Sequence, residues 1–200
     1  MKVVAIDGSP RRRGTVSTLV ETAAQAAEAC GAQVSRVRLY DKKIDWCKGC
    51  MVCRRTNKCP LADDLPALAK EICSADALIF GTPSYWGQPS AVTKALFDRL
   101  VGYFATYELI GRRFKISPHF KGLGKRAVVI TACTAPSPWA EIFGHSTGPV
   151  RLMRRMLKSG GIKIVGSLAC KDTWRRPHAK ERFRDRASAL GRRIAARSTL

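Results

Sequence analysis

The chain has 200 residues, of which 46% are hydrophobic, and 36 Lys and Arg residues against 15 Asp and Glu give it a formal net charge of +21. This length and composition are typical of one globular domain, which we expect to span residues 1–200. No run of 18 apolar residues predicts a transmembrane helix, and no secretory signal is visible, so we expect a cytoplasmic protein whose eight Cys residues form no disulfide framework.

The positive charge is concentrated in the last quarter of the chain. Residues 151–200 hold fifteen basic residues against three acidic ones, or +12 of the total. Such a surface can attract nucleic acid or steer anionic cofactors. Because no nucleic-acid-binding motif accompanies the charge, we expect a solvated basic face for most of these residues.

The first predicted elements are a strand and a helix joined by a short turn. Residues 3–6 are an apolar, mainly β-branched run, typical of a strand buried on both faces of a parallel sheet. A helix is predicted from about residue 15 to 30, where apolar side chains recur at helical spacing. The turn therefore lies at a helix N-terminus, where free N–H groups and the helix dipole favour an anion. Four side chains add donors there: Ser9, Arg11, Thr15 and Ser17.

The turn reads Gly8-Ser9-Pro10-Arg11 and is neither a P-loop nor the usual dinucleotide fingerprint. It resembles the flavin-phosphate loop of the flavodoxin-like NAD(P)H-dependent FMN reductases, which implies FMN as cofactor. Thr15-Val16 stands where that family commonly has Asn-Thr, and the Val16 side chain donates no hydrogen bond. The alternative is a basic surface turn without a ligand.

A second strand is predicted at residues 34–39, and the loop after it, 46–60, carries a cysteine motif. The spacing is Cys-x2-Cys-x2-Cys-x5-Cys-Pro, at Cys47, Cys50, Cys53 and Cys59. Four thiolates this close can surround a 4Fe-4S cluster, and the motif is similar to that of the iron–sulfur flavoproteins, a branch of the same family. Structural thiols beside the flavin and a zinc site remain open alternatives. The basic residues of the loop are expected to lower thiol pKa values: Lys48, Arg54, Arg55 and Lys58.

A helix is predicted from Asp63-Asp64 to about Cys73, and a third strand at 77–80. The loop at the end of that strand lies where ligands bind in open α/β sheets. It resembles the Thr-Pro-x-Tyr-Trp-Gly segment that holds the flavin ring in the FMN reductase family. The resemblance implies these cofactor-binding residues: Pro83, Tyr85, Trp86, Gly87 and Gln88. An aromatic-capped loop in the core is the alternative.

The next predicted helix, 90–104, includes Asp98-Arg99, which we interpret as structural or interfacial. Residues 103–125 form the least regular part, either an arm over a neighbouring subunit's flavin or a covered loop. A fourth strand at 126–131 leads into a loop that the family resemblance places beside the flavin, with Ala132 as a cofactor-binding residue. For Trp139 and His145 we favour loop packing over contact with nicotinamide.

A basic helix at 147–158, a fifth strand at 162–169 and a final helix after a break near Arg176-Pro177 complete the chain. Five strands alternating with helices predict a flavodoxin-like α/β fold, a doubly wound five-stranded parallel sheet with helices on both faces. The resemblance covers nearly the whole chain. It implies an FMN-dependent NAD(P)H oxidoreductase that reduces a small acceptor such as a quinone, a nitro or azo compound or a flavin.

In that reading no side chain is catalytic, because the flavin carries the chemistry. The resemblance also implies a homodimer or homotetramer without membrane attachment. Two other functions stay open: an electron carrier with a 4Fe-4S cluster on Cys47, Cys50, Cys53 and Cys59, and, suggested by charge alone, a nucleic-acid-binding or regulatory protein on the same scaffold.

Overall fold

A computed structural model describes residues 1–174 and 180–196, so the break expected near Arg176-Pro177 lies outside the described residues. Its main sheet has five parallel strands in the order β2-β1-β3-β6-β7, as the alternation of elements predicts. The chain extends the sheet to one side of β1 and then to the other, which places a topological switch point between β1 and β3. The strands are β1 (Lys2–Asp7), β2 (Gln33–Arg38), β3 (Ala77–Pro83), β6 (Arg126–Ala132) and β7 (Lys163–Cys170).

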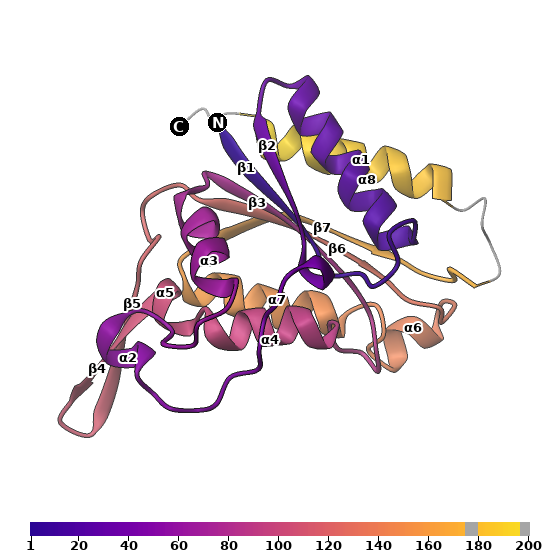
Figure 1. Ribbon diagram of the computed structural model, residues 1–200. Coiled ribbons are helices and arrows are strands. Elements are labelled where there is room, and N and C mark those ends of the chain that lie inside the picture. The colour runs from indigo at the N-terminus through magenta and orange to yellow at the C-terminus, as the bar shows by residue number, and fades with distance from the viewer. Residues whose placement is uncertain (175–179, 197–200) are drawn as a thin grey trace.

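Helices cover both faces of this sheet (Figure 1). One layer is α1 (Thr15–Ala29) with α8 (Lys180–Ala195), and the other consists of α3 (Leu65–Ser74), α4 (Ala91–Arg99) and α7 (Gly148–Ser159). Short elements lie in the connections: η1 (Leu39–Asp41), α2 (Cys53–Thr56), α5 (Val101–Phe104) and α6 (Trp139–Ile142). No helix in the described part of the chain is both long and apolar enough to span a bilayer.

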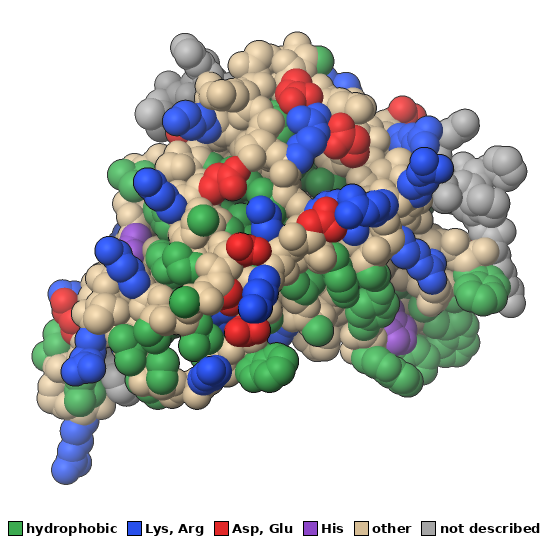
Figure 2. Space-filling view, viewed as in Figure 1, with side chains coloured by type: hydrophobic (Ala, Val, Ile, Leu, Met, Phe, Trp, Pro, Cys, Tyr) green, Lys and Arg blue, Asp and Glu red, His purple; other side chains and the backbone are tan. Residues whose placement is uncertain are grey.

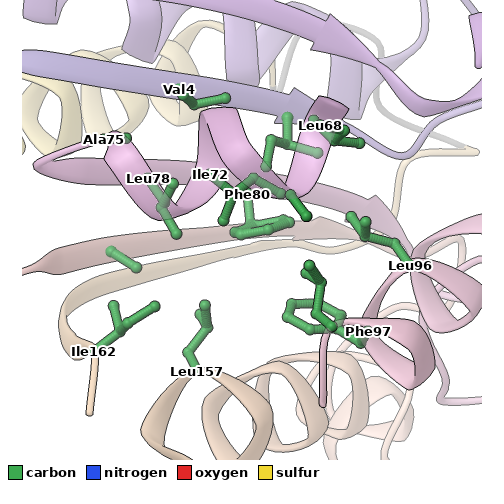
Figure 3. Close-up of a cluster of buried hydrophobic side chains, with 14 of the residues drawn as sticks. Val4, Leu68, Ile72, Ala75, Leu78, Phe80, Leu96, Phe97, Leu157 and Ile162 are labelled. Carbon is green, nitrogen blue, oxygen red and sulfur yellow. The ribbon is translucent and has the colours of Figure 1, made fainter. Parts of the chain in front are cut away.

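Each face of the sheet has its own hydrophobic core. On the side of α3, α4 and α7, Phe80 packs against Phe97 with ring centroids 5.1 Å apart, and Ile72 and Leu157 close the cluster (Figure 3). On the other side, alanines of α1 allow α8 to approach closely, and Gly191 sits against the Ala23 carbonyl. Every large apolar side chain buried here stabilises the fold by about 1.5–3 kcal/mol. The sheet is therefore a rigid support for the loops at its strand ends.

Part of the segment expected to be irregular is a β-hairpin. β4 (Ala105–Ile110) and β5 (Arg113–Pro118) pair antiparallel, and the hairpin projects from the body of the molecule (Figure 1). Gly111 adopts φ +60° in the two-residue turn, a conformation that suits tight hairpins. The predicted helix 90–104 is likewise divided at Leu100 into α4 and α5.

Candidate flavin site and cysteine loop

A cleft lies at the carboxyl ends of β1, β3 and β6, beside the switch point of the sheet. Its inner part is bounded by the turn after β1, the start of α1 and the loops after β3, β6 and β7. The residues that line it are Ser9, Pro10, Arg11, Gly14, Thr15, Val16, Pro83, Ser84, Tyr85, Ala132, Cys133, Thr134 and Thr173. An outer part continues along Ser84, Tyr85, Trp86, Cys133, Thr134, Ala135 and His145.

The turn after β1 is shaped by its own hydroxyl groups. Ser9 N–H donates to Asp7 Oδ1 at 2.8 Å, and Arg11 N–H donates to Ser9 Oγ at 3.2 Å. Ser17 does not line the cleft, because its Oγ donates to the Arg11 carbonyl at 2.7 Å. The exposed Arg11 side chain is therefore carried on a fixed backbone at the cleft wall.

The start of α1 leaves its first N–H groups without a side-chain cap, since Gly14 is the N-cap residue. A Cβ at Gly14 would lie 3.0 Å from the Arg11 Cβ, so the absence of a side chain keeps the turn tight. Asp7, the acidic residue nearest the turn, is paired with Arg38 at 3.1 Å. Because these N–H groups are uncapped and Arg38 balances the charge of Asp7, the turn suits a phosphate ester.

The turn after β3 presents two aromatic side chains at the mouth of the cleft. Tyr85 and Gln88 exchange backbone hydrogen bonds of 2.8 and 2.9 Å, and Trp86 and Gly87 between them have φ +52° and +71°. These positive φ values define a tight turn that exposes 93% of the Trp86 side chain. Pro83 and Tyr85 line the cleft, whereas the Gln88 side chain is exposed and does not.

Gly87 is held in place by the backbone at the start of α7. A Cβ on Gly148 would come within 2.0 Å of the Gly87 carbonyl oxygen, and one on Gly87 would meet the Gly144 oxygen at 3.2 Å. The turn that carries Tyr85 and Trp86 thus packs closely against the start of α7 through Gly87 and Gly148. This contact fixes the positions of the two aromatic rings.

Ser84 is a site residue that the sequence analysis missed. Its Oγ is buried, lines both parts of the cleft and has no hydrogen-bond partner within the described residues. Such a hydroxyl fits a ligand with polar edges, as a flavin has. Thr134 and Thr173 were missed too, although all three follow strands, where the strand-end rule would have found them.

The loop after β6 closes the cleft. Ala132 lines it as expected, and burial raises the pKa of the Cys133 thiol, which keeps this sulfur protonated. His145 borders the outer part, while Trp139 stacks on Phe143 with centroids 5.9 Å apart and is not a lining residue. Apolar side chains gather over α6 at this edge of the molecule (Figure 2).

The cysteine loop, 46–60, lies on the side of the sheet that carries α3 and α4. Cys47 and Cys50 are exposed and Cys53 and Cys59 half-buried, and all four are free thiols. Among the described residues, no three Cys, His, Asp or Glu side chains are arranged to hold a metal ion. The sequence spacing of the four cysteines is therefore that of a cluster motif, whereas their side chains in the structure do not form a metal site. Ligation of a cluster stays a prediction.

The effect expected of the basic residues on the thiols is wrong for Cys53. Burial raises the pKa of this thiol, and the neighbouring sulfurs of Cys59, Cys47 and Cys50 raise it further. The Arg54 guanidinium lies over the Tyr107 ring, 5.3 Å from the centroid, and Arg54 is not among the groups that shift the Cys53 pKa.

Arg99 closes the base of the cysteine loop. Its side chain is fully buried, pairs with the Asp63 carboxylate and donates to the Asp45 carbonyl at 3.1 Å. Arg99 Nε also donates to Cys59 Sγ at 3.2 Å, and its NH2 group reaches the Leu61 carbonyl at 3.4 Å. The Arg99 guanidinium therefore joins both ends of the cysteine loop to α4, which is a structural role as we expected.

Asp63 serves both this pair and the start of α3, because its Oδ1 accepts from the N–H of Leu65, the first residue of the helix, at 3.0 Å. Burial would raise the pKa of Asp63, but hydrogen bonds from Arg99 and from the Asp45 and Leu65 N–H groups outweigh it and lower the pKa. Asp98, next to Arg99, is exposed to solvent and pairs with Lys94 at 2.5 Å one helical turn earlier.

Comparison with known proteins identifies the family. A family model described as NADPH-dependent FMN reductase matches residues 1–130. The chain therefore belongs to the NADPH-dependent FMN reductase family, as the resemblance of its turns implied.

Among individual relatives, an iron-sulfur flavoprotein of Methanocaldococcus jannaschii is 40% identical over 99 residues, 50% of this chain and 51% of that protein. The match thus spans about half the length of this relative. An iron-sulfur flavoprotein of Archaeoglobus fulgidus is 28% identical over 197 residues, 97% of this chain and 94% of its own. An NAD(P)H:quinone oxidoreductase from Methanothermobacter marburgensis shares the fold, with a TM-score of 0.76, 21% identity and coverage of 100% of this chain and 98% of that chain.

Proposed function

We propose that this chain is an FMN-dependent NAD(P)H oxidoreductase that passes electrons to a small acceptor such as a quinone, a nitro or azo compound or a second flavin. The observation that carries the proposal is the cleft at the sheet switch point. It joins an uncapped helix start and Arg11 at one end to the Tyr85–Gln88 turn at the other. Family membership supports the same cofactor.

In this proposal the residues have separate roles. The N–H groups at the start of α1 and the hydroxyls of Ser9 and Thr15 receive the flavin phosphate, and Arg11 adds a charge-assisted hydrogen bond. Tyr85 and Trp86 form the wall for the ring, and Ser84 Oγ supplies a buried hydroxyl. Bound FMN supplies the hydride and electron transfer, so no catalytic side chain is required.

The test is reduction of the purified holoprotein without oxygen. Flavin released from the protein should be FMN by mass, and NADPH or NADH should bleach its visible absorbance. Menadione, a nitroaromatic and an azo dye, added in turn, should restore the absorbance and identify the acceptor class. A protein that neither retains FMN nor binds it on titration would overturn the proposal.

A second candidate is an electron carrier with a 4Fe-4S cluster on Cys47, Cys50, Cys53 and Cys59. The sequence spacing of the four cysteines and the names of the two relatives above support it. Each cysteine would be replaced by Ser in protein reconstituted anaerobically with iron and sulfide, with Cys30→Ser, an exposed thiol elsewhere, as control. Iron lost from all four variants, with FMN retained, supports the carrier, whereas parent protein without iron excludes it.

We propose further that the chain forms a homodimer or homotetramer in the cytoplasm. Large apolar side chains are exposed at Trp139, Ile142 and Phe143 near the cleft and at Leu109 and Ile110 on the hairpin, which suits self-association. The eight free thiols suit a reducing compartment. Light scattering should give twice or four times the 22.0 kDa chain mass, and Leu109→Lys with Ile110→Lys should reduce it. A parent protein of single-chain mass excludes the assembly.

A further inference from the structure

A second hollow, which shares no lining residue with the flavin cleft, lies along the edge strand β7 between α7 and α8. Its volume is about 530 Å³, within the range of small-molecule sites. One side of the hollow is formed by Val150, Arg151 and Arg154 of α7 and by Thr147, the N-cap residue of that helix. Arg186 of α8 lies on a different side. The remaining lining residues are Glu141, Ser146, Ser167, Ala169 and Lys171.

Three arginines line this hollow, and in the described part of the chain none of them has an acidic partner. Arg151 and Arg154 are three residues apart on α7 and so lie on one face of the helix. Arg186 stacks over Phe183, 5.8 Å from the ring centroid. Within the described ranges none of the three guanidinium groups forms an ion pair or a hydrogen bond.

Among the described lining residues the one carboxylate, Glu141, is already matched. Glu141 accepts from Lys171 and from Ser137 Oγ, and the hydrogen bond from Lys171 lowers the Glu141 pKa most. Glu141 therefore remains ionised and its charge is balanced by Lys171. The three arginines leave a surplus of positive charge that favours an anion with more than one negative charge.

The hollow and the flavin cleft lie next to each other, because residues that are adjacent in the chain line the two spaces. His145 lines the outer cleft and its chain neighbour Ser146 lines the hollow, and consecutive Cα atoms are about 3.8 Å apart. Thr173 lines the inner cleft and Lys171 the hollow, two residues apart, at most about 7 Å. A dinucleotide whose nicotinamide reaches the mouth of the cleft is therefore close enough for its other end to enter the hollow.

We propose that this hollow binds the 2′-phosphate of NADPH through Arg151, Arg154 and Arg186, a conclusion that rests on the proposed function. A phosphate monoester carries about −1.5 to −2 charges at neutral pH and presents three acceptor oxygens, which match guanidinium forks. Hydroxyls of Thr147 and Ser167 offer further donors. NADH lacks this phosphate, so the site makes the enzyme select NADPH.

The direct test measures binding to the FMN-loaded protein with 2′,5′-ADP, 5′-ADP and inorganic phosphate as probes. The 2′,5′-ADP is expected to bind at least tenfold more tightly than either of the others. Arg154→Gln should weaken 2′,5′-ADP by about tenfold and leave 5′-ADP unchanged. Arg155→Gln is the matched control, because Arg155 is exposed on α7 but does not line the hollow.

Steady-state kinetics give the second arm. Arg154→Gln should raise KM for NADPH about tenfold without changing KM for NADH or the flavin content. Equal effects of Arg154→Gln and Arg155→Gln, or phosphate binding as tightly as 2′,5′-ADP, overturn the proposal. If NADPH reduces the flavin normally in Arg154→Gln, the phosphate site is wrong and the proposed function stands. If neither nucleotide reduces the parent protein, the proposed function fails, and the site as an NADPH determinant fails with it.

Discussion

At the scale of single residues, Arg11 is the side chain that tests the proposed phosphate site. We expect Arg11→Ala to weaken FMN by about 10- to 100-fold, since a hydrogen bond to a charged group contributes roughly 1.5–3 kcal/mol. Riboflavin, which has no phosphate, should bind both proteins equally. Fluorescence titration measures this, with Arg13→Ala, in the same turn but away from the cleft, as control. Equal losses for FMN and riboflavin would refute the phosphate role.

A second residue-scale prediction concerns the buried pair of Arg99 and Asp63. Asp63→Asn leaves the guanidinium buried without its counter-charge, which should lower the free energy of unfolding by about 3–5 kcal/mol at pH 7. The folded-state pKa of Asp63 is depressed, so its stabilisation is present above the ordinary value of 3.8 and is lost as pH falls through the depressed pKa.

The difference between parent and Asp63→Asn in urea unfolding should therefore shrink below about pH 3.8. Asp98→Asn, which breaks only the helical pair with Lys94, should cost about 0.5 kcal/mol or less. A gap between parent and Asp63→Asn that stayed constant from pH 7 to pH 3 would show that the carboxylate does not carry the stabilisation.

At the scale of elements, the start of α7 supports the aromatic turn. Gly148→Ala places a methyl group against the Gly87 carbonyl, so the Trp86 turn must move. We expect altered flavin absorbance and weaker retention of FMN. Gly160→Ala, at the other end of α7, meets the Phe104 ring at 3.1 Å and serves as control, since it should change the melting temperature but not the flavin spectrum. A normal spectrum in both variants would contradict this coupling.

The elements that the sequence predicted are those with a strong local pattern. Residues 77–80 and 126–131 are apolar on both faces and are strands in the structure. The hairpin was missed, although Arg113, Phe114, Lys115 and Ile116 alternate as in a half-buried strand and Gly111 followed by Arg112 fits a two-residue turn. The free N–H groups at the start of α1 are predicted from the turn and the helix after it, whereas the Asp63–Arg99 pair, 36 residues apart, has no pattern at short range. Contacts of this kind depend on tertiary packing and are not readable from spacing.

At the scale of the whole molecule, the net charge of +21 affects the rate of encounter with anionic substrates. The second-order rate constant for flavin reduction by NADPH should fall several-fold between about 20 and 500 mM NaCl, because salt shortens the Debye length. Stopped-flow absorbance measures this. Reoxidation by a neutral quinone is the control and should be nearly independent of salt, and equal salt dependence of both steps would exclude steering.

The Arg99 contacts have a consequence for which changes of sequence this chain can tolerate. Because Asp45 and the 59–63 segment are fastened to the same guanidinium, the chain between them leaves and re-enters the fold at one point. Lengthening such an excursion costs little, since the closure entropy grows only slowly with its length. Residues 46–58 also contact the body of the molecule through Cys53, which packs against Gly102 of α5, and through Arg54, which lies over Tyr107. We therefore expect that changes in the number or spacing of cysteines outside these two contacts leave the flavin cleft intact.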